Sequence, residues 1–583
     1  MALLLVIVGC GLFLLLAYLG YGRVLSRLFG LDRAARTPAV ELRDDADYAP
    51  IRPRFLLGQH FSAIAAAGPI VGPILAGAMF GWAPALIWVL LGCVLIGGVH
   101  DLGALVASVR HRARSITEVV RRHVSGRAYA LFLVFVWISL IYVIVVFTDI
   151  VAGSFVGAQR LEDGTTVTGG AIASSSLIYL ALPVIMGLLM RYAKLPLFWA
   201  TLIFLPLVAL GIWAGPHLPL DLSRLFGDPG DAAAADSARK LWDLLLLGYC
   251  FAASLLPMWL LLQPRGHLGG YFLYAALLGG LLGIVVGAVS GSAAVQYPAF
   301  RGWSGPDGSN PLFPVLFVTV ACGACSGFHA LVASGTTSKQ LALETDARPV
   351  GYGAMLLEGM VAVVSLCCVM VLAPGGAGKA PNLVYAQGIG GFLGTFGVPA
   401  AFAVSFALLA FTTFVYDTLD VSTRLGRYVL EELFGTRLGN AGRWVATALT
   451  AGVPLLFVMQ SIPDGRGGFV AAWKVFWSLF GASNQLLAAL TLLAVTVWLV
   501  RTGRRWAWAV TGLPAAFMYV TSVWALARFV LDGFRPAGPG QGLPLWSSPV
   551  PWAAMVLTAL ALVLLAEAVR AFARPAEEDA ARS

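Results

Sequence analysis

The sequence places ionisable side chains inside long apolar stretches. Asp101 follows His100 in a glycine-rich segment, and Glu358 stands about seven residues into the apolar run 351–373. Ionisable groups are costly inside a membrane, so they are functional candidates wherever they occur there. A buried carboxyl group can also bind and release a proton near neutral pH. We therefore expect His100, Asp101 and Glu358 to take part in proton or ion coupling.

A polar stretch runs through residues 322–339. It contains Cys322 and Cys325, followed by Ser326 and His329. The Cys-x-x-Cys spacing is typical of redox or metal sites, but no second cysteine pair or histidine cluster accompanies it, so we predict no metal. Ser326 and His329 are three residues apart and can share a helix face. They could bind substrate, and His329 could instead carry a proton or be an ordinary core histidine.

Two apolar segments contain prolines that interrupt a helix. The first has two Gly-Pro pairs within residues 68–73, and the second has Pro257 within residues 254–259. Proline lacks a backbone donor and clashes with the preceding helical turn. Inside lipid, the backbone groups that are freed must find partners in protein, water or a ligand. The two segments therefore predict broken helices beside a cavity.

The composition identifies the elements that must hold these residues. Hydrophobic residues make up 59 % of the 583 residues, charged residues only 11 %, and the mean hydropathy is +0.84. Soluble proteins carry about 25 % charged residues, and disorder requires low hydrophobicity, so both classes are excluded. We predict an all-α polytopic membrane protein, with no nucleic-acid partner, no cofactor and no disulfide framework. About fifteen apolar segments are long enough to cross a bilayer, at 2–20, 60–80, 82–108, 128–150, 171–190, 195–214, 243–262, 270–290, 311–333, 351–373, 398–416, 443–460, 474–500, 507–530 and 550–570.

The distribution of basic residues predicts the orientation. If the loop 21–59 is cytoplasmic and the segments alternate, the cytoplasmic loops and tail hold 28 of the 38 lysine and arginine residues, including Arg265 in an expected loop 263–269. Positively charged loops stay on the cytoplasmic side. The amino terminus is then expected outside and the carboxyl terminus in the cytoplasm.

The two interrupted segments suggest an internal repeat. Pro69 and Pro257 are 188 residues apart, and this offset carries the second to fifth segments onto the seventh to tenth within about eight residues. A repeat of five crossings must be inverted, and paired broken helices indicate a transporter's binding site. Helix amino ends suit a carboxylate, so we predict a small organic anion or a zwitterion as substrate. The predicted substrate-binding residues are Gly68, Pro69, Gly72, Pro73, Ser254, Pro257, Trp259, Ser326 and His329.

The expected organisation has four parts. Residues 1–59 form an extra helix and a cytoplasmic loop, 60–214 the first five-helix repeat, 243–416 the second repeat, and 443–583 additional helices. The repeats are expected to bring the two interrupted segments together near the middle of the membrane.

The chain resembles the carbon starvation protein A family. The resemblance covers about residues 50 to 490, in the motifs Gly58-Gln59-His60-Phe61-Ser62, Gly68-Pro69-Ile70-Val71-Gly72-Pro73, Ser326-Gly327-Phe328-His329, Ser334-Gly335-Thr336-Thr337, Glu344-Thr345-Asp346-Ala347-Arg348, Gly351-Tyr352-Gly353-Ala354-Met355 and Ser483-Asn484-Gln485. It implies a bacterial inner-membrane system for the uptake of scarce carbon, linked to peptides and to pyruvate and driven by protons. It also implies a LeuT-like five-plus-five fold, with a cation site near Ala65, Gly68, Cys325 and Ser326.

The expected function is a secondary active importer that works by alternating access. Its predicted partners are a peptide or small carboxylate, a coupling proton or sodium ion, and the lipid bilayer. Two alternatives belong to other classes. One is an intramembrane hydrolase using Ser326 and His329, although no Gly-x-Ser-x-Gly elbow surrounds the serine. The other is a channel or sensor. The residues alone do not decide between peptide and pyruvate, and we predict no enzymatic activity.

Overall fold

The helix α9 (Gly126–Ser154) illustrates how the sequence sets a membrane-spanning element. The Ser125 side chain accepts a hydrogen bond from the backbone N–H of Ala128 and so caps the first turn. The following 29 residues are almost entirely apolar. At 1.5 Å per residue they extend about 44 Å, which exceeds the hydrocarbon core of about 30 Å. The helix can therefore cross a bilayer with residues to spare.

The computed structural model describes residues 1–44, 48–65, 67–160, 166–228, 230–306, 308, 310–373, 378–435, 439–460, 462–463, 469–535 and 548–573. Within these residues, twelve helices are long and apolar enough to cross a membrane, or thirteen if the bent pair α4 (Pro53–Ile64) and α5 (Gly68–Phe80) counts as one. The chain is therefore an all-α polytopic membrane protein, with twelve or thirteen helices that meet this criterion against about fifteen expected segments. One reason for the difference is that the expected span 311–333 is divided into α14 (Leu312–Thr319), α15 (Ala321–Ala324) and α16 (Gly327–Val332).

The remaining α-helices follow in chain order: α1 (Ala2–Leu19), α2 (Tyr21–Phe29), α3 (Pro38–Glu41), α6 (Trp82–Gly92), α7 (Gly98–Arg110), α8 (Ile116–His123), α10 (Gly169–Tyr192), α11 (Leu197–Ala214), α12 (Ala232–Leu255), α13 (Leu262–Ser290), α17 (Ala354–Met370), α18 (Pro381–Gly394), α19 (Ala400–Phe434), α20 (Gly439–Val458), α21 (Ala472–Arg501), α22 (Leu513–Gly533) and α23 (Val550–Ala573). Short 3-10 or π-helical turns are η1 (Cys93–Gly97), η2 (Gly215–His217), η3 (Leu222–Leu225), η4 (Ala333–Thr337), η5 (Glu344–Asp346), η6 (Arg348–Gly353) and η9 (Trp508–Gly512). Two antiparallel hairpins pair β1 (Ala158–Arg160) with β2 (Thr166–Thr168), and β3 (Ile462–Pro463) with β4 (Phe469–Val470).

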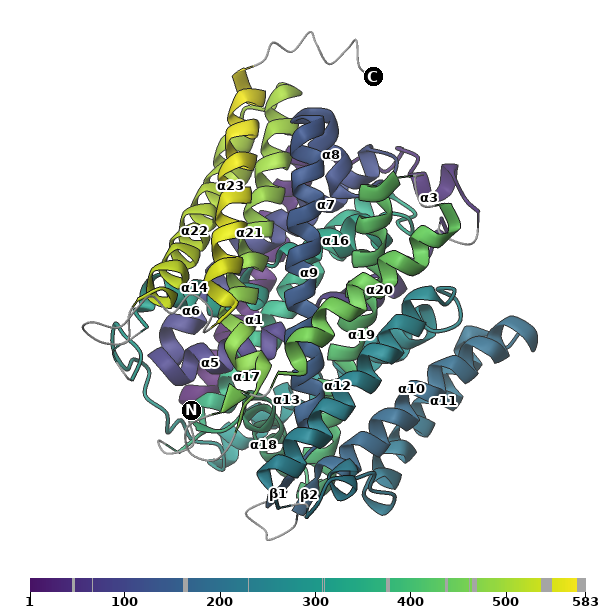
Figure 1. Cartoon of the computed structure of the whole chain (residues 1–583), viewed down its shortest axis with the longest axis vertical. Helices are drawn as coiled ribbons and strands as arrows, with labels where there is room; N and C mark the ends of the chain where they lie inside the picture. Colours follow the sequence, from purple (N-terminus) through teal and green to yellow (C-terminus); the bar gives the residue numbers. More distant parts are fainter. Residues whose placement is uncertain are drawn as a thin grey trace.

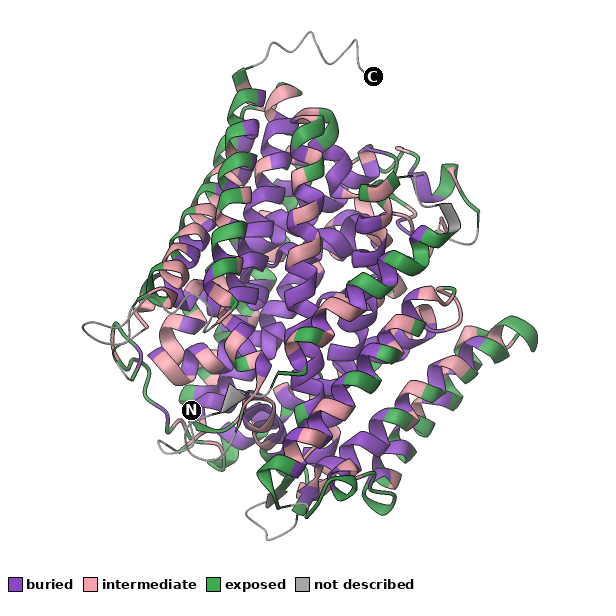
Figure 2. Cartoon of the chain, in the orientation of Figure 1, coloured by how far each residue is buried: buried purple, intermediate pink, exposed green. Residues whose placement is uncertain are grey.

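The helices divide into a buried centre and an apolar rim. In the most apolar part of α21, 89 % of the residues are buried, against 33 % in α23. Figure 2 shows exposed residues along the length of α23 and along the α10–α11 hairpin, which stands at the edge of the molecule in Figure 1. The exposed side chains of this hairpin include Phe198, Trp199 and Trp213. Such an apolar surface suits contact with lipid. The helices α9, α17, α19 and α21 are mostly buried and form the centre.

Candidate functional site

The interruption between α4 and α5 faces a second interruption between α14 and α16. The axes of α4 and α5 are bent by 47°. In the facing segment the backbone is extended at Cys325 and Ser326, between α15 and α16. A Cβ atom at Gly68 would lie 2.2 Å from the Cβ of Cys322. Both broken segments therefore pack in direct contact, and glycine is needed at the point of closest approach.

The segment around Pro257, which the sequence pairs with this site, contacts α19 and α10. Pro257 lies in the connection between α12 and α13, after α12 has ended at Leu255. Arg424 donates to the carbonyl oxygens of Ala253, at 2.8 Å, and Leu256, at 2.7 Å. The ring of Trp259 lies 6.3 Å from that of Tyr192 in α10. The carbonyl groups at the end of α12 thus find their partner in α19.

Four ionisable side chains meet beside the two breaks. Nδ1 of His100 lies 2.7 Å from Oδ1 of Asp101, and Nδ1 of His329 lies 2.9 Å from Oδ2 of the same carboxylate. Nε2 of His329 lies 3.2 Å from Oε2 of Glu358. This last pair is within ion-pair distance but is not aligned as a hydrogen bond, since neither Glu358 oxygen has a hydrogen-bond partner among the described residues.

This Asp101–His329–Glu358 cluster is completely enclosed by protein. Its side chains are at most 1 % exposed. An imidazole between two carboxyl groups can accept a proton from one and donate a proton to the other, because its two nitrogens point in different directions. The cluster therefore has the composition needed to bind and release a proton inside the membrane. The structure brings together three residues that the sequence analysis selected separately.

Glycines in α6 and the following turn set the position of Asp101. A Cβ atom at Gly92 would lie 2.6 Å from the Cβ of Ala324, and one at Gly97 would lie 2.4 Å from its carbonyl oxygen. Because glycine has no Cβ atom, the helix that leads to Asp101 can approach α15 closely. The π-helical turn η1 precedes α7, and such turns are frequent at functional sites.

Asn484 of α21 holds the extended backbone of the second break. Its Nδ2 donates to Oγ of Ser326 at 3.0 Å and lies 3.2 Å from Sγ of Cys322. Its Oδ1 accepts from the backbone N–H of Phe328 at 3.0 Å. A side-chain amide in this position replaces helical hydrogen bonds that the break has removed. The hydroxyl of Ser326 is thus held by Asn484, and among the described residues it has no hydrogen bond to the imidazole of His329.

A second charged cluster, which the sequence analysis missed, centres on Arg265 in α13. Its Nε lies 2.6 Å from Oδ1 of Asp417, its Nη2 donates to the carbonyl oxygen of Tyr416 at 2.7 Å, and its Nη1 pairs with Asp420. Arg265 is fully buried, so its expected place in a loop is wrong. The hydroxyl of Ser62 donates to Oδ2 of Asp417 at 2.5 Å. The cluster therefore joins α4 to α13 and α19.

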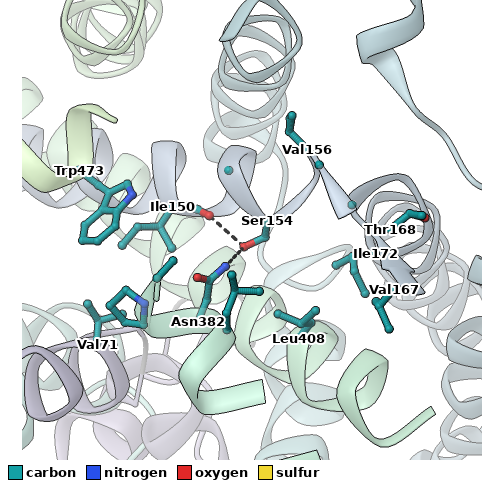
Figure 3. Close-up of a pocket in the computed structure, with 16 residues that line it drawn as sticks. Val71, Ile150, Ser154, Val156, Val167, Thr168, Ile172, Asn382, Leu408 and Trp473 are labelled. Carbon is teal, nitrogen blue, oxygen red and sulfur yellow. Dashed lines mark hydrogen bonds between the residues drawn. The ribbon is translucent and has the colours of Figure 1, made fainter. Parts of the chain in front are cut away.

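A cavity lies on each side of the first break. One is lined by Val71 of α5 together with Ser154, Asn382 and Trp473, and Figure 3 shows Asn382 pointing toward Ser154, to which its Nδ2 donates at 2.9 Å. The other is a crevice that residues of α4, α13, α16, η4 and α19 surround. Its lining residues are Gln59, His60, Ala63, Leu262, Gly266, Val332, Thr336, Thr337, Asp417 and Val421. The same broken span thus runs from one cavity to the other.

Comparison with known protein families identifies the chain. The model of the family described as carbon starvation protein CstA matches residues 1–381 and 377–525. The chain belongs to the CstA family. The peptide transporter CstA of Helicobacter pylori strain J99 is 31 % identical over 561 residues, which cover 84 % of this chain and 77 % of the relative.

Two Escherichia coli K12 proteins are similarly related. The peptide transporter CstA is 31 % identical over 584 residues, covering 88 % of this chain and 79 % of the relative. The pyruvate/proton symporter BtsT is 30 % identical over 596 residues, with the same coverage of 88 % and 79 %. Relatives in this CstA family carry the names of transporters, which places the chain among membrane transporters rather than enzymes. The hydrolase alternative is not supported.

Two solved structures align with most of the chain at low identity. A manganese transporter of Eremococcus coleocola, in complex with an aromatic bis-isothiourea substituted compound, is 15 % identical with a TM-score of 0.44, covering 91 % of this chain and 99 % of that structure. MhsT in complex with L-phenylalanine is 13 % identical with a TM-score of 0.46, covering 89 % of this chain and 98 % of that structure.

Proposed function

We propose that this protein imports a small carboxylate-bearing carbon source together with protons, by alternating access. The observation that carries the proposal is the broken span α4–α5, which borders one cavity through Val71 and the other through His60. Movement of the two halves of this span would open one cavity and close the other. The Asp101–His329–Glu358 cluster stands beside the break and supplies groups that exchange a proton.

The helix contacts support an inverted repeat with boundaries that differ from those expected from the sequence. We assign α4–α5, α6–α7, α9, α12 and α13 to the first repeat, and α14–α16, α17, α19, α20 and α21 to the second. Corresponding elements then contact each other, as α5 with α15, α9 with α19, and α12 with α20. Crossed contacts also occur in matching pairs: α9 with α20 and α19 with α12, and α4 with α13 and α14 with α21.

A two-fold relation between repeats requires such matching pairs, because each contact generates its symmetry mate. Under this assignment, the α10–α11 hairpin is an insertion at the edge of the bundle, consistent with its position in Figure 1. The break between α4 and α5 then corresponds to the break at Cys325 and Ser326. These two breaks, rather than 68–73 and 254–259, would form the substrate site.

The substrate site is proposed between the start of α5 and the extended backbone before α16. Gly68, Pro69, Gly72, Pro73 and Ser326 contribute backbone groups or a hydroxyl there, with Ala65 and Cys325 beside them. The positive end of the helix dipole at the start of α5 suits a carboxylate. The relatives from Escherichia coli are named as transporters of peptides and of pyruvate. Both kinds of substrate carry a carboxylate. A peptide would also place its ammonium group near the acidic cluster.

The cellular setting follows from the charge distribution. We propose the inner membrane of a bacterium, with the amino terminus outside and the carboxyl terminus in the cytoplasm. The crevice beside His60 would then open toward the cytoplasm, because α4 follows directly after the basic loop 21–52. Single cysteines placed in the hydrophilic connections, labelled with an impermeant maleimide in intact cells, test this orientation, since the seven native cysteines are all buried.

Transport by the purified protein in proteoliposomes tests the function. A pH gradient, acidic outside, is expected to drive accumulation of radiolabelled pyruvate or of a labelled dipeptide, and a protonophore is expected to abolish it. The variant Glu358→Gln is the matched comparison, because it removes the ionisable carboxyl group but preserves the size of the buried side chain. Its proton-driven accumulation is expected to fall. Accumulation driven only by a sodium gradient, or ionic conductance without saturable uptake, would contradict proton-coupled import.

A further inference from the structure

We propose that His60 passes protons between the Asp101–His329–Glu358 cluster and the crevice beside α4, and thus forms the proton's path to one side of the membrane. This inference rests on the proposed function, since it assigns a route to the coupling proton. It adds a residue to the transport cycle that neither the sequence pattern nor the relatives' names assign.

The geometry of His60 is that of a relay group. It lies about one turn before the end of α4, and only 1 % of its surface is exposed. Its Nδ1 lies 2.8 Å from the hydroxyl of Thr337 in η4, whereas its Nε2 has no hydrogen-bond partner among the described residues. A buried ring nitrogen without a partner is costly, and such atoms call for a functional explanation. Nε2 is the atom available to accept and release the transferred proton.

His60 lies near both the cluster and the crevice. Its helix α4 contacts α16, which carries His329, and α17, which carries Glu358, and its side chain lines the crevice. The other ionisable group in the crevice lining is Asp417, which Arg265 and Ser62 already engage. Asp417 is therefore poorly suited to shuttle protons. The elements that pack against α4 carry several charged or ionisable side chains, including His329 of α16, Glu358 of α17, Arg265 and His267 of α13, Asp417 and Asp420 of α19, and Arg348 of η6. Asp101 reaches this group through its contact with His329.

The proposed transfer conserves protons at each step. The cluster binds one proton from the opposite side of the membrane, and His329 returns to its neutral state when that proton moves to Nε2 of His60. The imidazolium of His60 then gives the proton to water in the crevice. The hydrogen bond from Nδ1 to Thr337 holds the ring in place throughout. No covalent bond other than N–H and O–H forms or breaks.

The test compares two transport modes in proteoliposomes. Proton-driven accumulation requires net proton transfer, whereas counterflow exchange of labelled for unlabelled substrate at equal pH does not. For His60→Gln we expect accumulation to fall about a hundredfold, the scale of a lost acid–base group, while counterflow stays near the wild-type rate. His60→Glu, which restores an ionisable group, should recover part of the accumulation with a shifted pH optimum. Gln59→Ala, in the same crevice, should change neither mode.

Each outcome decides the matter. Wild-type accumulation in His60→Gln would overturn the relay. A parallel fall of accumulation and counterflow in both His60→Gln and His60→Glu, with the melting temperature unchanged, would also overturn it and make His60 a substrate or packing residue. If His60→Gln does not fold, His60→Asn and His60→Glu provide the same comparison. Absence of proton-driven accumulation in the wild type would instead refute the proposed function.

Discussion

Nδ1 of His329 lies 2.9 Å from Oδ2 of Asp101, although 228 residues separate them in the chain. The contact joins α16, which begins after the second break, to α7, and the segment before α7 packs on α15 through Gly92 and Gly97. Any movement of α16 must therefore break or carry along this pair. A proton on the cluster and the position of α16 are coupled by geometry, as ion-coupled transport requires.

Substitutions in the cluster should separate coupling from transport. Asp101→Asn removes the shared carboxylate, so proton-driven accumulation should fall about a hundredfold. Glu358→Gln should act similarly with less effect on folding, because neither Glu358 oxygen has a hydrogen-bond partner among the described residues. Uptake in proteoliposomes as a function of external pH measures both effects. Retention of a wild-type pH profile by Glu358→Gln would exclude that carboxyl group from coupling.

Closer packing at the first break should not be tolerated. A Cβ atom at Gly72 would lie 2.5 Å from the backbone oxygen of Thr319, and backbone atoms yield poorly. We expect Gly72→Ala to lower stability by about 1–3 kcal/mol, as for other overpacked sites. Thermal unfolding in detergent measures this. Gly248→Ala in α12 is the matched control, since no atom lies within 4 Å of its Cβ position; equal melting temperatures for both variants would contradict the prediction.

Removal of Arg265 should strongly destabilise the protein. Arg265→Ala leaves Asp417 and Asp420 buried without their cation, and breaking a buried ion pair costs about 3–5 kcal/mol. The melting temperature of the purified variant measures the loss. Because the cost arises from unpaired carboxylates, adding Asp417→Asn and Asp420→Asn should recover part of it. Arg528→Ala, whose pair with Asp532 is partly exposed, should lose no more than about 1 kcal/mol.

Acid should weaken the connection between α7 and α8. Burial lowers the pKa of His111 below its usual 6.5, and its Nε2 lies 2.9 Å from Nε2 of His123. The unfolded chain then binds a proton more readily than the folded one. The stabilisation is present above about pH 6.5 and declines as the pH falls toward the lowered pKa. In His111→Gln, melting temperatures between pH 7.5 and pH 5.5 should decline less than in the wild type; an equal decline would sink this prediction.

The class of the protein and its buried ionisable residues follow from local sequence. Runs of apolar residues fix membrane-spanning helices without knowledge of their neighbours, because lipid demands internally satisfied backbones. The cost of burying an ionisable group marked Asp101, Glu358 and His329 for the same reason. Gly-Pro pairs at 68–73 predicted a break in this span, although residues 68–73 are helical and the interruption lies just before them, because proline is tolerated in the first turn of a helix. These features depend on single segments, so the sequence alone decided them.

The pairing of segments could be decided only by the tertiary structure. Hydropathy offsets matched the first break with Pro257, yet the backbone around Pro257 is satisfied by Arg424, whereas Cys322 packs on Gly68. The sequence analysis placed Arg265 in a loop, because its partners Asp417 and Asp420 lie more than 150 residues away in the chain. Buried charges are acceptable only in the presence of such distant partners. A linear sequence records the residue types but not which of them will meet.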